Sequence, residues 1–289
     1  MDRVILQLLD EHNCQSVTDY ENALKEIMQE VTLLGLWRVK FYEHALFYGG
    51  SCLRILYGLP RFSEDLNFSL LRPDPDFDLA KYHAAIAVEL EGFGFEVDIQ
   101  TKNKSNYSQI DSAFIKAGTK IHFLKIRLPD TLLARVHSNQ TLEIKIEVDL
   151  NPPGNHGVEV KNIFRPIPFQ VKTMPIADLF AGKLHAVLAR KWQTRVKGRD
   201  YYDYLWYLGR RSVLSLRHLA ARLHQSGHLA GELTTDIFQE MLMQRFEELD
   251  IKKAKKDAAP FLNDREKQTL ELWSNDYFLK TVKGIEYRL

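Results

Sequence analysis

The stretch "FYGGSCLRILYGLPRFSEDLNFSL", residues 47–70, decides the fold expected for this chain. Two adjacent glycines, Gly49 and Gly50, end an apolar segment and precede a short helical run. Glycine leaves the backbone amides bare and a helix N-terminus favours negative charge, so this turn is suited to binding phosphate. The hydroxyl of Ser51 would add a further donor. A glycine pair alone is more often an ordinary tight turn. Whether this turn binds phosphate therefore has to be judged from the residues that follow it.

The segment that follows, "SEDLNFSL" (63–70), alternates polar and apolar residues with the period of two that is typical of a strand. The two faces are Leu66, Phe68 and Leu70 on the core side and Asp65, Asn67 and Ser69 on the other. Two oxygen-bearing side chains directly after a phosphate-ready turn are what a Mg²⁺ ion bridging to a nucleoside triphosphate requires. A solvated strand face is the ordinary alternative.

A third oxygen ligand is expected from a neighbouring strand, and "LEIKIEVDL" (142–150) offers one. Its alternation places Ile144, Ile146 and Val148 inward and Glu143, Lys145, Glu147 and Asp149 outward. Asp149 lies at the end of this strand and is the predicted third carboxylate. Charged strand faces are commonly just solvated, so this segment supports a metal site only in combination with Asp65 and Asn67.

The whole chain sets wider limits. Its 289 residues suffice for two ordinary domains, and the 45% hydrophobic and 27% charged composition indicates a folded globular protein. Cys14 and Cys52 have neither metal-site nor disulfide-framework spacing, which favours a reducing compartment, the cytoplasm. No signal peptide and no apolar run of membrane-spanning length is evident, so no membrane role is expected.

The periodicity of the apolar residues divides the chain into two parts. The first part is predicted to begin with a helix over about residues 20–37 and a second helical stretch up to Phe47, with a further helix at about 78–91. Its predicted strands are 65–70, 95–101, 112–118, 122–128 and 142–150. The second part is predicted to be a bundle of helices, including 176–192, 199–211, 216–225 and 236–249.

The motifs together resemble the AbiEii-type nucleotidyltransferase family, which includes the MenT-like toxins of bacterial toxin–antitoxin systems. The pieces that carry the resemblance are "GGSCLR" (49–54), "YGLPRFSEDLNF" (57–68), "IEVDLNP" (146–152), "GKLHAVLARKW" (182–192) and "GRDYYDYL" (198–205). The resemblance implies an α+β fold: a polymerase-β-like core with a mixed sheet flanked by helices, followed by a C-terminal helical bundle. We therefore expect a nucleotidyltransferase core over residues 1–172 and a helical domain over residues 173–289.

By this resemblance, Gly50 and Ser51 contact the triphosphate, Asp65 is a catalytic residue that binds magnesium, and Lys183 and Asp200 contribute to the active-site cleft as catalytic residues. Gly49 is a predicted nucleotide-binding residue of the same turn. Arg54 and Arg190 are further predicted nucleotide-binding residues. Lys183 and Arg190 are seven residues apart on one predicted helix and so share a face. The ordinary alternatives are a solvent-facing helix edge for these two cations and, especially for Asp203, an acid that merely favours the helix dipole.

Asn67 departs from the family pattern, which usually has aspartate at this position. A neutral amide oxygen attracts a second cation less than a carboxylate does, so we expect an unusually high requirement for Mg²⁺ or a preference for Mn²⁺. Glu147 lies on the same face as Asp149 and is a candidate to compensate.

The leading functional hypothesis is a Mg²⁺-dependent enzyme that transfers a nucleoside monophosphate from NTP to an acceptor and releases pyrophosphate. In relatives the acceptor can be the 3′ end of tRNA, and the basic segment 190–199, which contains Trp192, favours an RNA. A toxin implies a cognate antitoxin protein as partner. Two alternatives remain: a nucleotide- or RNA-binding protein with weakened catalysis, and nucleotidylation of a small molecule or a protein.

Overall fold

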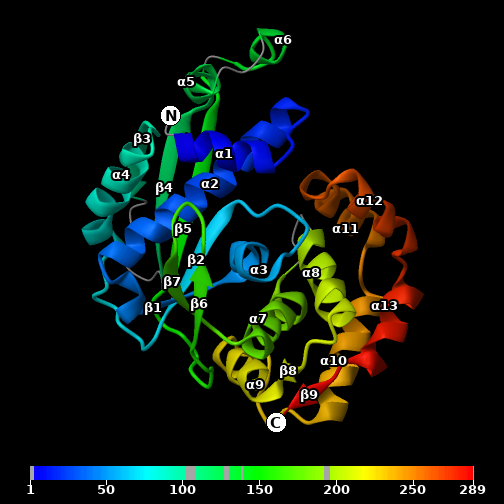
Figure 1. The fold of residues 1–289 in the computed structure, drawn as a ribbon. Coiled ribbons are helices and arrows are strands. Elements are labelled where there is room, and N and C mark those ends of the chain that lie inside the picture. Colours follow the sequence, from blue (N-terminus) through cyan, green and yellow to red (C-terminus); the bar gives the residue numbers. More distant parts are fainter. Residues whose placement is uncertain (1–2, 102–108, 127–129, 138, 192–195, 289) are drawn as a thin grey trace. The chain divides into compact units, whose positions relative to one another are not determined.

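The chain folds into two compact units in this computed structural model, which describes residues 3–101, 109–126, 130–137, 139–191 and 196–288 (Figure 1). The first unit comprises residues 1–57, 63–152 and 160–173, and the second comprises 58–62, 153–159 and 174–289. None of the described helices has the length and apolarity needed to cross a membrane.

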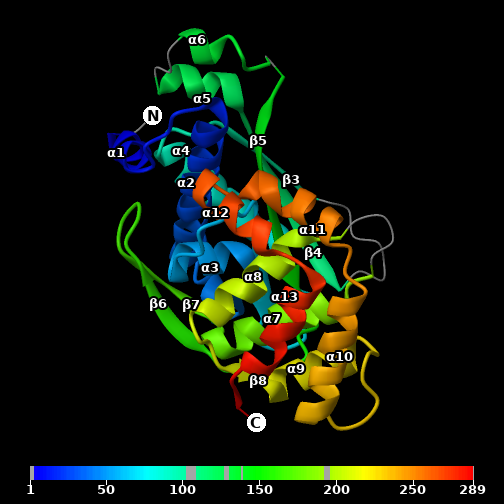
Figure 2. The ribbon, with the colours of Figure 1, turned by 90° about the vertical axis from the view of Figure 1, so that its right-hand side faces the viewer.

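The first unit is built on a seven-stranded mixed sheet with the strand order β3-β4-β5-β2-β1-β7-β6. The strands are β1 (Ala45–Tyr48), β2 (Asp65–Leu70), β3 (Val97–Thr101), β4 (Ile110–Gly118), β5 (Thr141–Asp149), β6 (Glu159–Ile163) and β7 (Phe169–Thr173). Strand β2 lies between β1, to which it is antiparallel, and β5, to which it is parallel. Figure 2 shows β6 and β7 as a hairpin at one edge of the sheet.

Helices flank this sheet. They are α1 (Arg3–Glu11), α2 (Val17–Arg38), α3 (Gly49–Tyr57), α4 (His83–Gly92), α5 (Thr119–Lys125) and α6 (Asp130–Leu133), with 3₁₀ turns at Phe41–Glu43 and Leu79–Tyr82. Helix α2 begins with a capping box between Ser16 and Asp19 and packs against α4, β5 and β7. The expected core residues of the two central strands are buried: Leu66, Phe68, Leu70, Ile144, Ile146 and Val148. The mixed sheet flanked by helices confirms the predicted α+β class.

The second unit is mainly helical. Its elements are α7 (Ile176–Ala189), α8 (Gly198–Gly209), α9 (Leu216–Gln225), α10 (Thr235–Glu247), α11 (Ile251–Ala258), α12 (Asp264–Thr269), α13 (Asn275–Thr281), 3₁₀ turns at Ala259–Phe261, Leu270–Leu272 and Val282–Gly284, and the strand pair β8 (Leu214–Ser215) and β9 (Tyr287–Arg288). Aromatic side chains form its core, with Phe180 stacked on Tyr207 at a ring-centroid distance of 4.4 Å. This confirms the prediction of C-terminal helices.

Two predictions of secondary structure were wrong. The helical stretch expected up to Phe47 is instead a 3₁₀ turn followed by β1, because Lys40 adopts a left-handed conformation (φ 60°) after α2 ends. The strand expected at 122–128 is helix α5 as far as Lys125, and residues 127 and 128 lie outside the described part. The buried residues there, Thr119, His122 and Phe123, recur at helical spacing.

Candidate functional site

The Gly-Gly turn joins β1 to α3 and lies against Asn67. Gly49 has a φ of +85°, a conformation that favours glycine, and a Cβ there would be 3.1–3.3 Å from atoms of the Asn67 side chain. Tyr48, the last residue of β1, is the register partner of Asn67. The predicted phosphate-binding turn and the predicted metal-binding strand are therefore adjacent. Position 49 favours glycine because its φ is positive and because a Cβ there would crowd the Asn67 side chain.

Two buried polar side chains hold the backbone around Asp65. Ser51 is fully buried, and its hydroxyl donates a 2.5 Å hydrogen bond to the carbonyl oxygen of Asp65. Gln29 of α2, only 1% exposed, donates through Nε2 to the carbonyl oxygen of Ser63 at 2.9 Å. The Ser51 side chain thus positions strand β2. The backbone amide of Ser51, and not its hydroxyl, is the group suited to binding a phosphate. Sequence reasoning missed Gln29 because its partner is 34 residues away.

The register between β2 and β5 decides which carboxylate accompanies Asp65 and Asn67. Asp65 is the register partner of Lys145, and Asn67 that of Glu147. Asp149 is aligned with Ser69, four residues beyond the level of Asp65, or about 13 Å along the strand. Its Oδ1 accepts a hydrogen bond from the backbone of Asn151 at 3.0 Å. The structure therefore places Glu147 beside Asn67 and leaves Asp149 at the end of β5, beside Ser69.

The chemistry of this face fits a hard divalent cation. Asp65 and Glu147 offer carboxylate oxygens and Asn67 offers an amide oxygen, while Lys145 forms an ion pair with Glu147. Among the described residues, no three His, Cys, Asp or Glu side chains form a ready-made metal cluster. Magnesium in nucleotide-dependent enzymes commonly takes one or two carboxylates and completes its shell with water and substrate phosphates. Asp65, Asn67 and Glu147 are sufficient for that mode.

Arg54, a predicted nucleotide-binding residue, is engaged elsewhere in the first unit. Its Nε lies 2.5 Å from Oε2 of Glu26, and the two side chains are 15% and 7% exposed. Arg165 extends the same group of charges through a 2.7 Å ion pair with the buried Glu30. Arg54 therefore ties α3 to α2, which fixes the helix that begins at the Gly-Gly turn.

In the second unit, five charged side chains form one cluster: Arg61, Lys183 of α7, Arg190 directly after α7, and Asp200 and Asp203 of α8. Lys183 Nζ lies 2.8 Å from Oδ1 of Asp200 and 2.7 Å from Oδ2 of Asp203. Arg190 Nε lies 3.1 Å from Oδ2 of Asp200. Arg61, which is 3% exposed, binds Asp203 through two hydrogen bonds of 2.5 and 2.6 Å. The predicted residues Lys183, Arg190 and Asp200 are thus brought together.

This cluster keeps both of its carboxylates ionised. Burial by itself would raise the pKa of Asp200, but Lys183, Arg190 and Lys197 outweigh it and hold that pKa well below its usual value. Burial would also raise the pKa of Asp203, but Arg61 and Lys183 outweigh it and lower that pKa. A carboxylate with so low a pKa is a poor proton acceptor. Asp200 and Asp203 are therefore suited to holding cations in place.

The "GRDYYDYL" motif is fixed by close packing against α11. A Cβ on Gly198 would be 1.9 Å from the carbonyl oxygen of Ala254, so only glycine fits. The guanidinium of Arg199 stacks 3.8 Å from the centroid of the Phe261 ring. The interpretation of Asp203 as an acid that merely favours the helix dipole was wrong, since its side chain is fully buried and bound by Arg61.

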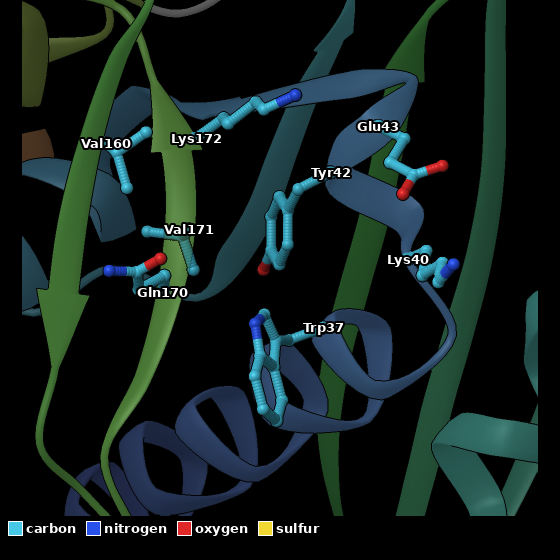
Figure 3. A pocket seen from close by; sticks show the side chains of 8 residues that line it. All are labelled: Trp37, Lys40, Tyr42, Glu43, Val160, Gln170, Val171 and Lys172. Atoms are coloured by element: carbon cyan, nitrogen blue, oxygen red, sulfur yellow. The ribbon is translucent and has the colours of Figure 1, made fainter.

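A separate pocket of about 190 Å³ lies in the first unit (Figure 3). The side chains of Trp37 and Tyr42 lie opposite Val160, Gln170 and Val171 of the β6–β7 hairpin. Its remaining lining residues are Lys40, Glu43 and Lys172. None of the residues predicted to bind metal or nucleotide lines this pocket.

The fold and these two groups of residues define the class of the protein. The family "Nucleotidyl transferase AbiEii toxin, Type IV TA system" matches residues 32–281, most of the chain. The chain belongs to this family of nucleotidyltransferase toxins. The predicted family is thereby confirmed. Trp192, part of the predicted RNA-binding segment, lies outside the described residues.

Solved structures similar to this chain include two from Helicobacter pylori. The crystal structure of JHP933 shares 16% identity, covers 91% of this chain and 93% of its own, and has a TM-score of 0.49. A structure described as a "putative nucleotidyltransferase from H. pylori" shares 15% identity, covers 91% and 97%, and has a TM-score of 0.48. At such values the likeness is no guide to activity. No curated protein matches the chain in sequence.

Proposed function

We propose that this protein transfers a nucleoside monophosphate from NTP to an RNA acceptor, the 3′ end of a tRNA, in a reaction that depends on Mg²⁺. The observation that supports this most strongly is the adjacency of the Gly49 turn to Asn67, which itself lies beside Glu147 and on the same strand as Asp65. Membership of a nucleotidyltransferase toxin family agrees with it.

Asp65, Asn67 and Glu147 would hold the Mg²⁺ ion, assisted by phosphate oxygens of the substrate. A magnesium ion bound there supplies positive charge to offset the negative charge that develops on the reacting phosphates. The amides of Gly49, Gly50 and Ser51 at the start of α3 bind phosphate oxygens, because the first turn of a helix has no internal partners for them. Asp149 is the less suitable third ligand because of its register.

The proposed catalytic role of Lys183 is that of a cation for the phosphates, with Arg190 in support. Asp200 binds both cations and orients them, since its low pKa makes it unsuitable as a base. In the reaction the acceptor hydroxyl oxygen bonds to the α-phosphorus as the bond to the β-phosphate oxygen breaks. Pyrophosphate leaves, and the hydroxyl proton passes to water.

An RNA acceptor is favoured by the positive charge around α8. Residues 190–199 include five cations and no acid, and Lys191 is exposed. Such a segment binds a phosphate backbone through counterion release, so binding of tRNA should weaken steeply with salt. A flat response to salt would favour the transfer to a small molecule or a protein. As a toxin, the protein would be paired with a cognate antitoxin protein.

The second candidate function is that of a nucleotide- or RNA-binding protein with weakened catalysis. It is favoured by Asn67, a neutral residue on the metal-binding face. Incubation with each α-labelled NTP, Mg²⁺ and total RNA separates the two. Transfer of label into RNA with release of pyrophosphate supports the enzyme. Nucleotide binding with no transfer from any NTP supports the binding protein.

A further inference from the structure

The predicted metal-binding face contains a cation of its own. In the parallel pair β2–β5, Lys145 is the register partner of Asp65, and Glu147 is that of Asn67. Neighbouring strands lie about 4.8 Å apart and alternate residues share a face, so these four side chains form one patch on the sheet. The side chains of Lys145 and Glu147 are 28% and 27% exposed, so both are accessible to a ligand.

The charge of this patch is low for a site that holds two metal ions. Among these four side chains, Asp65 and Glu147 contribute two negative charges, Lys145 contributes one positive charge and Asn67 contributes none, a net charge of −1. Asp149 lies on the same face of β5 but one alternate position further on, level with Ser69. Lys145 forms an ion pair with Glu147, and its Nζ lies 5.9 Å from the ring centroid of Phe114 on β4. Two divalent ions about 3.5–4 Å apart repel each other strongly unless several carboxylates lie between and around them.

We propose that Lys145 is a resident cation of this face, that the face binds one divalent ion instead of two, and that the Lys145 ammonium supplies the second positive charge to the substrate phosphates. The proposal rests on the proposed role of Asp65 as a metal ligand. It explains why Asn67 replaces a carboxylate here: beside a lysine and a single metal ion, a third carboxylate is not needed to balance the charge.

Titration with Mn²⁺ alone, followed by electron paramagnetic resonance, tests this without turnover. The ions that belong to the face are those whose binding is lost in Asp65→Asn, and we expect one per chain. Lys145→Met should bind that ion about tenfold more tightly, because it removes a nearby positive charge and frees Glu147. The same variant should transfer nucleotide more slowly at saturating Mg²⁺, so that affinity and rate change in opposite directions.

Lys116→Met is the matched control. Lys116 lies on the adjacent strand β4 and forms a 3.6 Å ion pair with Glu143, two residues before Lys145 on β5. This variant should bind Mn²⁺ and transfer nucleotide like the wild type. Thermal unfolding confirms that both variants are folded.

Two results would overturn the inference: two Mn²⁺ ions per chain that both depend on Asp65, or Mn²⁺ affinity in Lys145→Met equal to that of Lys116→Met. A different result, in which Asp65→Asn leaves both Mn²⁺ binding and transfer intact, would instead refute the metal site of the proposed function. The two failures are therefore distinguishable.

Discussion

Asn67→Asp restores a carboxylate at the centre of the proposed metal-binding face. The change is isosteric, so the contact of residue 67 with Gly49 is preserved and the effect is one of charge. The new carboxylate would lie about 5–7 Å from the carboxylates of Asp65 and Glu147 and at a similar distance from Lys145. At an effective dielectric constant between 20 and 80, each such interaction amounts to roughly 0.6–3 kcal/mol, and to about 1 kcal/mol for partly exposed side chains nearer the upper dielectric limit.

Two repulsions and one attraction leave the metal-free protein less stable by about 1 kcal/mol, which lowers the melting temperature by about 2–4 °C. A divalent ion reverses the sign, because it attracts the new carboxylate twice as strongly as a single charge does. The Mg²⁺ concentration for half-maximal transfer should therefore fall at least about tenfold, equivalent to about 1.4 kcal/mol. Melting curves with and without Mg²⁺ and a Mg²⁺ titration of the transfer rate measure both effects.

Asn67→Ala is the companion variant. It removes the amide oxygen and should raise the Mg²⁺ requirement. If Asn67→Asp and Asn67→Ala both leave the Mg²⁺ dependence and the metal-free melting temperature unchanged, Asn67 is not a ligand and the assignment of this face is wrong.

Three further predictions concern stability. Asp203→Asn leaves the buried Arg61 without its charged partner and should destabilise the second unit by about 3–5 kcal/mol, seen in chemical denaturation; a loss below 1 kcal/mol would contradict the pairing. Gly198→Ala should also lower the melting temperature, because the added Cβ would be 1.9 Å from the Ala254 carbonyl oxygen, and wild-type melting would refute that contact. Burial raises the pKa of Glu30 to about 8, so the folded protein binds this proton more tightly than the unfolded chain does, and its contribution to stability is lost as the pH rises from about 4.5 through 8. Glu30→Gln should therefore melt above the wild type at pH 9 and approach it at pH 5, and an equal difference at both pH values would refute the shift.

The strands that carry the proposed metal ligands could be predicted from the sequence because their alternation is regular. The bounds 65–70 agree with β2, and the inward residues of β5 are buried as expected. The β6–β7 hairpin was missed, since each strand has five residues and their apolar positions are interrupted by charges and amides. Short elements of this kind are stabilised by pairing with neighbours, which periodicity does not reveal.

The composition of the site was less predictable than its location. Alternation places Glu147 and Asp149 on one face but does not say which of them lies beside Asn67, because that depends on the register with β2. The tie between Arg54 and Glu26, and that between Arg61 and Asp203, join residues 28 and 142 positions apart. Such long-range pairs decide whether a cation is available to a substrate, and one sequence contains no local signal for them.

Nucleotide transfer by the wild type and by Asp65→Asn tests whether this protein is a Mg²⁺-dependent nucleotidyltransferase that uses Asp65. Each α-labelled NTP is incubated with the protein, Mg²⁺ and tRNA, and label in the RNA and released pyrophosphate are measured together. The proposed function predicts equal amounts of both products for the wild type and a rate at least about 100-fold lower for a folded Asp65→Asn, which loses charge stabilisation of the transition state. Transfer by Asp65→Asn at the wild-type rate, or no transfer by the wild type with any NTP, would contradict it.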